Sequence, residues 1–196
     1  DNGGVILKYE KVILDTDICI KIGNYEKVKF LEILIPKIVK KAYMHKYVYE
    51  NELLTPKNAK VQIDNLIKCG TIEILDEDKL DKLEKLIYNQ TKNILKKYMI
   101  GTKEEGKNWG EVVSLSMAKT LNISYFVSDE KEIQPIINTH LNSGNEYDIT
   151  VIRIENIINW IKENPECGIN RKTAKAIWRS CGKSNSDFDS YIWKNN

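Results

Sequence analysis

The sequence predicts a three-layer α/β/α fold around a central, mostly parallel sheet of about five strands, with a C-terminal helical extension. Short β-like runs alternate with longer helical stretches, which is the pattern of right-handed β-α-β crossovers. Two of the runs, residues 12–14 (VIL) and 125–127 (YFV), are apolar throughout, as strands are when helices cover both faces of their sheet. The length of 196 residues suits one well-filled domain.

The predicted strands are all short, and they lie at 12–14, 42–48, 71–75, 124–128 and 149–152. The helical segments between them are longer, and they lie at about 24–35, 52–69, 77–98, 109–121 and 130–140. The hydrophilic stretch GTKEEGKN at 101–108 contains two glycines and no apolar residue, so it predicts a flexible loop. After the last strand, IENIINWIKEN at 154–164 and a basic segment at 170–183 predict two more helices.

Composition excludes several classes of protein. The net charge of +2 gives no overall basic field, and no apolar run approaches the roughly 18 residues that a membrane helix needs. Residues 1–11 do not have the pattern of a signal peptide. The four cysteines are scattered without close spacing, which predicts reduced thiols in a cytoplasmic protein and no zinc site. Only two histidines are present, so catalysis by a histidine-activated nucleophile is not expected.

Acidic residues collect where the predicted strands end. The first strand runs into Asp15 and Asp17, the second is followed by Glu50 and Glu52, and the fourth by Ser128, Asp129 and Glu130, while Glu111 opens the helix after the 101–108 loop. In a parallel α/β sheet these places meet at one edge, where ligands bind. Carboxylates about 4 Å apart repel by roughly 4 kcal/mol, so such a cluster favours bound cations. Oxygen ligands suit Mg²⁺ or Mn²⁺, and such sites hydrolyse phosphodiesters.

Capping is the alternative explanation for each acid taken singly. Acidic side chains are common in the first turn of a helix, where they accept backbone hydrogen bonds and interact with the helix dipole. Glu111, Asp129 and Glu130 all stand at predicted helix starts, and Asp17 could cap a helix after the first strand. The convergence of four separate segments is what favours a metal site.

Three motifs in order resemble those of the PIN domain, a family of metal-dependent nucleases. VILDTDICI at 12–20 resembles the opening strand with its Asp-Thr-Asp motif, and YVYENELL at 47–54 resembles the step where the family places a Glu before Leu. NWGEVVSLSMAKTLNISYFVSDEKEI at 108–133 resembles the Gly-Glu helix and the strand that ends in Ser and an acid. The resemblance covers about 12–152, so it implies a PIN-like nuclease domain at 1–152 that includes a helical excursion at about 77–107.

The resemblance also implies roles for individual residues. By position, the catalytic and metal-binding acids would be Asp15, Glu52, Glu111 and Asp129, holding Mg²⁺ or Mn²⁺. Glu50 is the alternative for the second acid, because Glu50 and Glu52 would point to opposite sides of a helix and cannot both face inward. Glu130 is the alternative for the fourth acid. The supporting residues that orient the acids or water would be Thr16, Asp17 and Ser128. Residues 153–196 are expected to be a helical extension packed on the same domain.

Basic residues suggest where a polyanion would bind. The segment 171–183 carries five basic side chains and no acid: Arg171, Lys172, Lys175, Arg179 and Lys183. Trp178 lies among them, either to stack on a base or to fill the core. RNA is the expected substrate, with DNA as an alternative. Two kinds of protein partner, an antitoxin-like protein and a second copy of the chain, stay open.

Two other functions compete with a nuclease. VILDTDICI also resembles the Asp-x-Asp opening of haloacid-dehalogenase-type phosphatases, in which the first Asp is a nucleophile. The later motifs of that family are absent from this sequence, because VSDEKEI fits them poorly. The other alternative is a PIN-like scaffold that binds RNA or a protein without catalysis, although the acids that catalysis needs are all present.

Overall fold

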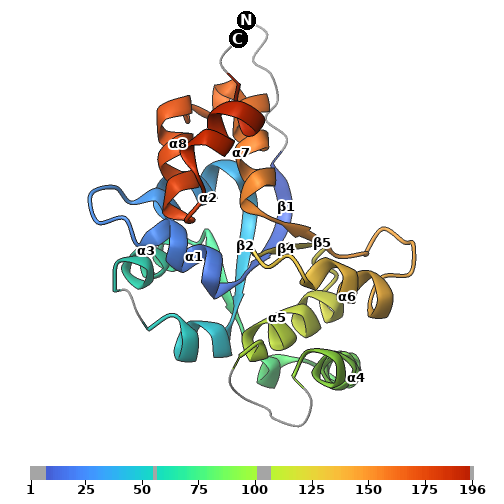
Figure 1. The fold of residues 1–196 in the computed structure, drawn as a ribbon. Coiled ribbons are helices and arrows are strands. Elements are labelled where there is room, and N and C mark those ends of the chain that lie inside the picture. The colour runs from blue at the N-terminus through green and yellow to red at the C-terminus, as the bar shows by residue number, and fades with distance from the viewer. Residues whose placement is uncertain (1–7, 55–56, 101–106, 195–196) are drawn as a thin grey trace, which may run out of the picture.

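A five-stranded sheet runs through the centre of the protein. The structure is a computed structural model, and it describes residues 8–54, 57–100 and 107–194. The sheet order is β3-β2-β1-β4-β5, with every neighbouring pair parallel. The strands are β1 Tyr9–Leu14, β2 Val39–His45, β3 Ile72–Leu75, β4 Tyr125–Val127 and β5 Thr150–Ile152. Helices cover both faces of the sheet (Figure 1), which confirms the predicted three-layer α/β/α class.

The helices form two layers (Figure 1). One face carries the helices that follow β1, β2 and β5, which are α1 Thr16–Gly23, α2 Phe30–Ile38, α3 Lys57–Lys68, α7 Ile154–Glu163 and α8 Arg171–Ser180. The other face carries α5 Trp109–Thr120 and α6 Ile133–His140, with α4 Lys82–Met99 packed against α5. Short helical turns complete the chain: η1 Val48–Glu52, η2 Glu77–Lys79, η3 Pro165–Cys167, α9 Asn185–Asp187 and η4 Phe188–Ile192.

Element boundaries differ from the sequence prediction at β2 and at the helices that follow β1. Strand β2 spans Val39–His45 and not 42–48, because the chain turns into the π-helical η1 at Val48. The helix expected at about 24–35 begins later, as α2 at Phe30, and a further helix that was not expected, α1, starts directly after β1, where the Asp15 side chain accepts a hydrogen bond from the Thr16 backbone. Most of the loop predicted at 101–108 lies outside the described residues.

The order of the strands creates a switch point between β1 and β4. From β1 the chain moves outward to β2 and β3, and it then returns across the opposite face to β4 on the other side of β1. Connections on opposite faces therefore leave a crevice at the carboxyl ends of β1 and β4, which is where α/β proteins bind ligands. Asp15 and Ser128 follow these two strands directly.

The C-terminal region contributes its own buried side chains. Helix α8 contacts α1, and the Trp178 side chain on α8 is only 3% exposed. The indole Nε1 of Trp178 donates a hydrogen bond to the carbonyl of Ser184 at 2.8 Å. Phe188 in η4 is fully buried beside Trp178, whereas Tyr191 in the same turn is 77% exposed. Trp178 is therefore a core residue here and offers no face for a base to stack on.

This packing predicts a large difference between two aromatic truncations. Trp178→Ala should lower the free energy of unfolding by about 3–5 kcal/mol, because it leaves a cavity and removes the hydrogen bond to Ser184. Tyr191→Ala should change it by less than about 0.5 kcal/mol, because that ring lies in solvent. Urea denaturation followed by circular dichroism measures both. Equal effects of the two substitutions would contradict the burial of Trp178.

Candidate functional site

The candidate site lies at the switch point, where the first residues after β1 and β4 remain bonded to the sheet. The Asp15 backbone N–H donates to the carbonyl of Val127 at 3.0 Å, and the Ser128 N–H donates to the carbonyl of Ile152 at 3.1 Å. Both residues therefore continue the strand ladder by one step. Their side chains are held by the sheet, which is the most rigid part of the fold.

The Asp15 carboxylate is buried and fixed by two hydrogen bonds. Its side chain is only 2% exposed. Oδ1 accepts from the backbone N–H of Thr16 at 2.8 Å, and Oδ2 accepts from the Ser128 hydroxyl at 3.0 Å. One donor thus holds each oxygen, and the two hydrogen bonds orient the carboxylate in a site where water has little access.

Glu52 joins Asp15 from the π-helical turn η1. The hydroxyl of Thr16 donates to Glu52 Oε2 at 2.7 Å, so the backbone and the side chain of this one residue hold both acids. The Glu52 carboxylate lies against the backbone of Gly110, where an added Cβ would come within 2.3 Å of Oε2. A larger residue there would require the Glu52 carboxylate to move. Gly110 was not among the predicted site residues. The signal in the sequence that could have indicated its contact with Glu52 is a glycine directly before the acid Glu111 at a helix start.

Glu111 is the third acid, in the first turn of α5. Burial, followed by the charge of Glu111, raises the pKa of Asp15 from its usual 3.8 to about 8, and Glu52 adds a smaller contribution. Burial likewise raises the pKa of Glu111, with contributions from Glu52, Glu130 and Asp17. Three segments far apart in the sequence therefore bring their carboxylates close enough to oppose one another's ionisation.

None of the three acids Asp15, Glu52 and Glu111 forms an ion pair with another described residue. Over the described ranges, no three His, Cys, Asp or Glu side chains surround one point closely enough to make a complete protein metal cage. Mg²⁺ commonly binds through one or two carboxylates and keeps its remaining ligands as water or phosphate oxygens. The donor chemistry here fits that incomplete type of site.

The structure brings Glu52, and not Glu50, to Asp15. Glu50 is exposed and lines a separate cavity of about 170 Å³ with Lys46, Asp76, Glu77 and Asp78. The π-helical geometry of η1 changes the angle between successive side chains. Residue spacing on an ideal helix could therefore place Glu50 and Glu52 on opposite sides, but it could not show which of them faces inward.

Asp129 points into a group of cations. Its carboxylate, 5% exposed, lies 3.5 Å from Lys21 Nζ, 3.4 Å from Lys183 Nζ and 3.4 Å from Arg153 Nη2. These cations come from α1, from the segment after α8 and from the end of β5, respectively. Glu130 is exposed, its backbone N–H donates to Ser128 Oγ at 3.3 Å, and its charge acts on Glu111. Of the two predicted candidates for the fourth acid, Glu130 is the one whose charge contributes to the raised pKa of Glu111.

Asp17 has a different environment from the other supporting residues. It forms an i,i+4 ion pair with Lys21 at 2.6 Å on the surface of α1, and its side chain is 39% exposed. Thr16 and Ser128 both donate to the acids, whereas Asp17 acts on Glu111 only through its charge.

The predicted nucleic-acid-binding helix is partly neutralised within the protein. Arg171 and Lys175 both pair with Asp189 of η4, and Lys183 pairs with Asp129 and Glu155. Lys172 and Arg179 are exposed. Arg171 and Lys175 therefore fasten η4 to α8, and the five residues do not form one open basic surface.

Comparisons with known proteins give one distant likeness of fold. No protein-family model matches the sequence, and no curated protein matches it. Among solved structures, the chain is similar to VapBC2 from Rickettsia felis, crystallised with a DNA fragment from its promoter. The identity is 16%, the match covers 73% of this chain and 98% of the other, and the TM-score is 0.44. A likeness at this level bears on neither activity nor substrate.

Two further predictions from the sequence are that the thiols are reduced and that no apolar run is long enough for a membrane helix. All four cysteines are free, and Cys19, Cys167 and Cys181 are buried. Across residues 8–54, 57–100 and 107–194, no helix has both the length and the hydropathy to cross a membrane.

The buried Asp15 predicts that the stability of the metal-free protein depends on pH. The raised pKa means that the folded state binds one more proton than the unfolded state between pH 3.8 and about 8. In EDTA, the contribution of Asp15 to stability should therefore be fully present at low pH and fall by up to about 1.4 kcal/mol per pH unit as pH rises through this window. Asp15→Asn should reduce that slope, because an amide does not titrate. Urea denaturation at a series of pH values measures it, and equal slopes for the two proteins would contradict the assignment.

Proposed function

We propose that this protein is a metal-dependent phosphodiester hydrolase that cleaves RNA. The observation that carries the proposal is the meeting of Asp15, Glu52 and Glu111 at the switch point without a cation from the described chain. A fold that needed only stability would not place three unpaired carboxylates together, because each opposes the ionisation of the others. A site that binds a divalent cation needs that excess of negative charge.

Asp15 and Glu111 would hold Mg²⁺ or Mn²⁺, with Glu52 as a further ligand or as the acceptor for a bound water. Carboxylate oxygens are the donors that these hard cations prefer. When bound, such a cation supplies Lewis acidity and neutralises negative charge at the phosphate. The PIN-domain resemblance of the three motifs points to the same ligands and the same metals.

The neighbouring side chains position the acids. Ser128 and the Thr16 backbone hold the two oxygens of Asp15, and the Thr16 hydroxyl holds Glu52. Outer hydrogen bonds of this kind orient metal-binding groups before the ion arrives. Gly110 lets Glu52 approach, since any side chain at that position would occupy the space of its carboxylate.

Glu130 is a better candidate than Asp129 for the fourth acid. The Asp129 carboxylate is already matched by Lys21, Arg153 and Lys183, so binding a metal would require it to leave three cations. Asp129 instead gathers these cations immediately after Ser128, beside the acidic site. Lys21 also pairs with Asp17, and Arg153 and Lys183 also pair with Glu155, so this network is balanced within the described chain.

The central test is RNA cleavage in the presence of Mn²⁺. The wild-type protein should cleave single-stranded RNA with Mn²⁺ and not with EDTA, and Asp15→Asn should slow cleavage by at least about 100-fold because it removes a ligand and its charge. Exposed Glu146 lies on a distant loop, so Glu146→Gln is the matched control and should cleave at the wild-type rate. Cleavage by Asp15→Asn at the wild-type rate would overturn the proposal, and turnover of p-nitrophenyl phosphate through a phosphorylated Asp15 would replace it with the phosphatase.

Gly110→Ala tests the contact between α5 and Glu52. The new methyl group should displace the Glu52 carboxylate and reduce RNA cleavage by about 10–100-fold, as loss of a positioning contact does. Adding Gly110→Ala to Glu52→Ala should cost little more, because the two changes act through the same carboxylate. A double mutant whose loss equals the product of the two single losses would show that Gly110 acts independently of Glu52.

A further inference from the structure

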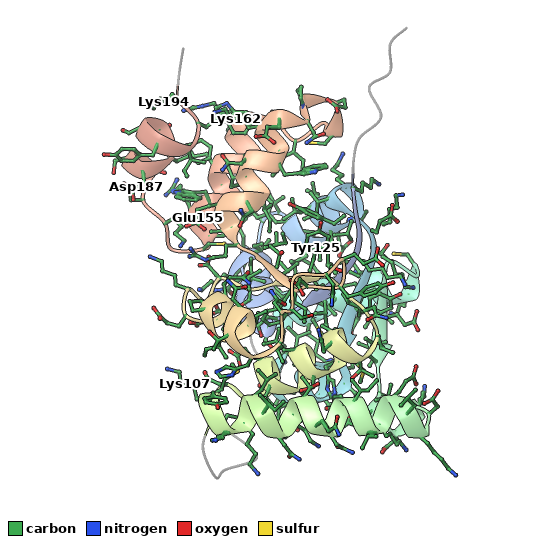
Figure 2. The ribbon with its side chains drawn as sticks, turned by 90° about the vertical axis from the view of Figure 1, so that its right-hand side faces the viewer. Lys107, Tyr125, Glu155, Lys162, Asp187 and Lys194 are labelled. Carbon is green, nitrogen blue, oxygen red and sulfur yellow. The ribbon has the colours of Figure 1, made fainter. Side chains whose placement is uncertain are left out.

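A cavity of about 200 Å³ opens beside the candidate site, between the end of α4 and the starts of α5 and α6. Glu111 forms part of its lining, so the cavity adjoins the candidate site at this one of the three acids. Lys107 lies near the end of α4 in Figure 2 and also lines the cavity. Cavities for drug-sized ligands usually exceed about 300 Å³, so this one suits a single small ring system.

The cavity has an apolar wall made by Met99, Ile133 and Ile136. Tyr98 adds an aromatic ring that is 49% exposed and stacks on His140 with 3.7 Å between ring centroids and 15° between planes. The Asn108 side-chain amide donates to the Met99 carbonyl at 3.2 Å, which ties the end of α4 to the start of α5. Apolar side chains and a fixed aromatic ring are the surroundings that favour a flat heterocycle.

The polar rim contains Glu130, Glu132 and Lys107, which are all exposed and whose side chains have no hydrogen-bond or ion-pair partner among the described residues. Together with Glu111 the carboxylates make the rim acidic, so a phosphate group would be repelled. Ionised carboxylates accept hydrogen bonds only, whereas the lysine only donates. The group that fits must therefore offer donors to an acid and an acceptor to a lysine.

We propose that this cavity binds a guanine base of the RNA strand next to the scissile phosphate. Guanine has two adjacent donors, N1–H and the exocyclic amino group, which match one carboxylate, and its O6 and N7 accept from a lysine. Glu132 is the carboxylate assigned to this role. The charge of Glu130 acts on Glu111, so Glu130 is assigned to the metal-binding acids instead. The inference rests on the proposed function in taking RNA as the substrate, and it adds a base preference to that substrate.

The test compares short oligouridine RNAs that contain one guanosine, one inosine or no substitution. Inosine lacks the exocyclic amino group, so it separates the carboxylate contact from the rest of the base. Binding is measured by fluorescence anisotropy with the Asp15→Asn protein, which leaves the RNA intact, and cleavage positions are mapped with the wild-type protein and Mn²⁺. Guanosine should bind about 10-fold more tightly than inosine, and cleavage should occur beside it.

Two variants remove separate parts of the proposed contact. Glu132→Gln should abolish the preference for guanosine over inosine without changing the affinity for oligouridine, and Glu166→Gln, at an exposed glutamate on η3, is its control. Ile136→Trp should fill the cavity and lower guanosine binding to the oligouridine level, whereas Val61→Trp on exposed α3 should not. Glu132→Gln alters an exposed side chain, so the test does not depend on the folding of Ile136→Trp.

The outcomes separate this inference from the proposed function. Guanosine-selective binding that Glu132→Gln removes, in a protein that does not cleave RNA, would keep the cavity assignment and overturn the nuclease. Mn²⁺-dependent cleavage with no base preference, or a preference that Glu132→Gln and Ile136→Trp leave unchanged, would keep the nuclease and overturn the cavity assignment. Tighter binding of the inosine or uridine RNA would also overturn it.

Discussion

The buried carboxylate of Asp15 is the constraint around which the other parts of the site are arranged. It follows β1 in the centre of the sheet, so it cannot turn to solvent without breaking the strand ladder. Burial disfavours its charged form, and two hydrogen-bond donors, the Thr16 backbone and the Ser128 hydroxyl, offset only part of that cost. A divalent cation would compensate the rest, which links the stability of this region to the proposed chemistry.

The two layers of helices meet the sheet at this carboxylate from opposite sides. Helix α1 begins at Thr16 and holds Glu52 by its hydroxyl, while α5 brings Glu111 and leaves space at Gly110 for the same glutamate. Asp15 and Glu52 are thus held by hydrogen bonds from other elements, whereas Glu111 is placed by its own helix. A change in the packing of either layer would move the acids relative to one another, even though no acid had been altered.

Two segments that carry none of the three acids, the C-terminal region and α4, also reach the site. Lys183 follows α8 and joins Arg153 and Lys21 around Asp129, so residues after 152 share an ion network with α1 and the end of β4. On the other side, α4 supplies Tyr98 and Met99 to the cavity beside Glu111. Both segments therefore lie next to the acidic site, one at Asp129 and the other at Glu111.

The sequence by itself determined the fold class, because alternating apolar runs and amphipathic stretches leave few arrangements other than a covered parallel sheet. It also determined that Asp15 and Glu111 would stand at the ends or starts of elements, since such positions follow from local patterns. The motif resemblance favoured Glu52 over Glu50, and only the tertiary structure shows what holds Glu52, namely the Thr16 hydroxyl and the space at Gly110. The cations around Asp129, the pairing of Arg171 with Asp189 and the burial of Trp178 depend on residues distant in sequence, and no local pattern encodes them.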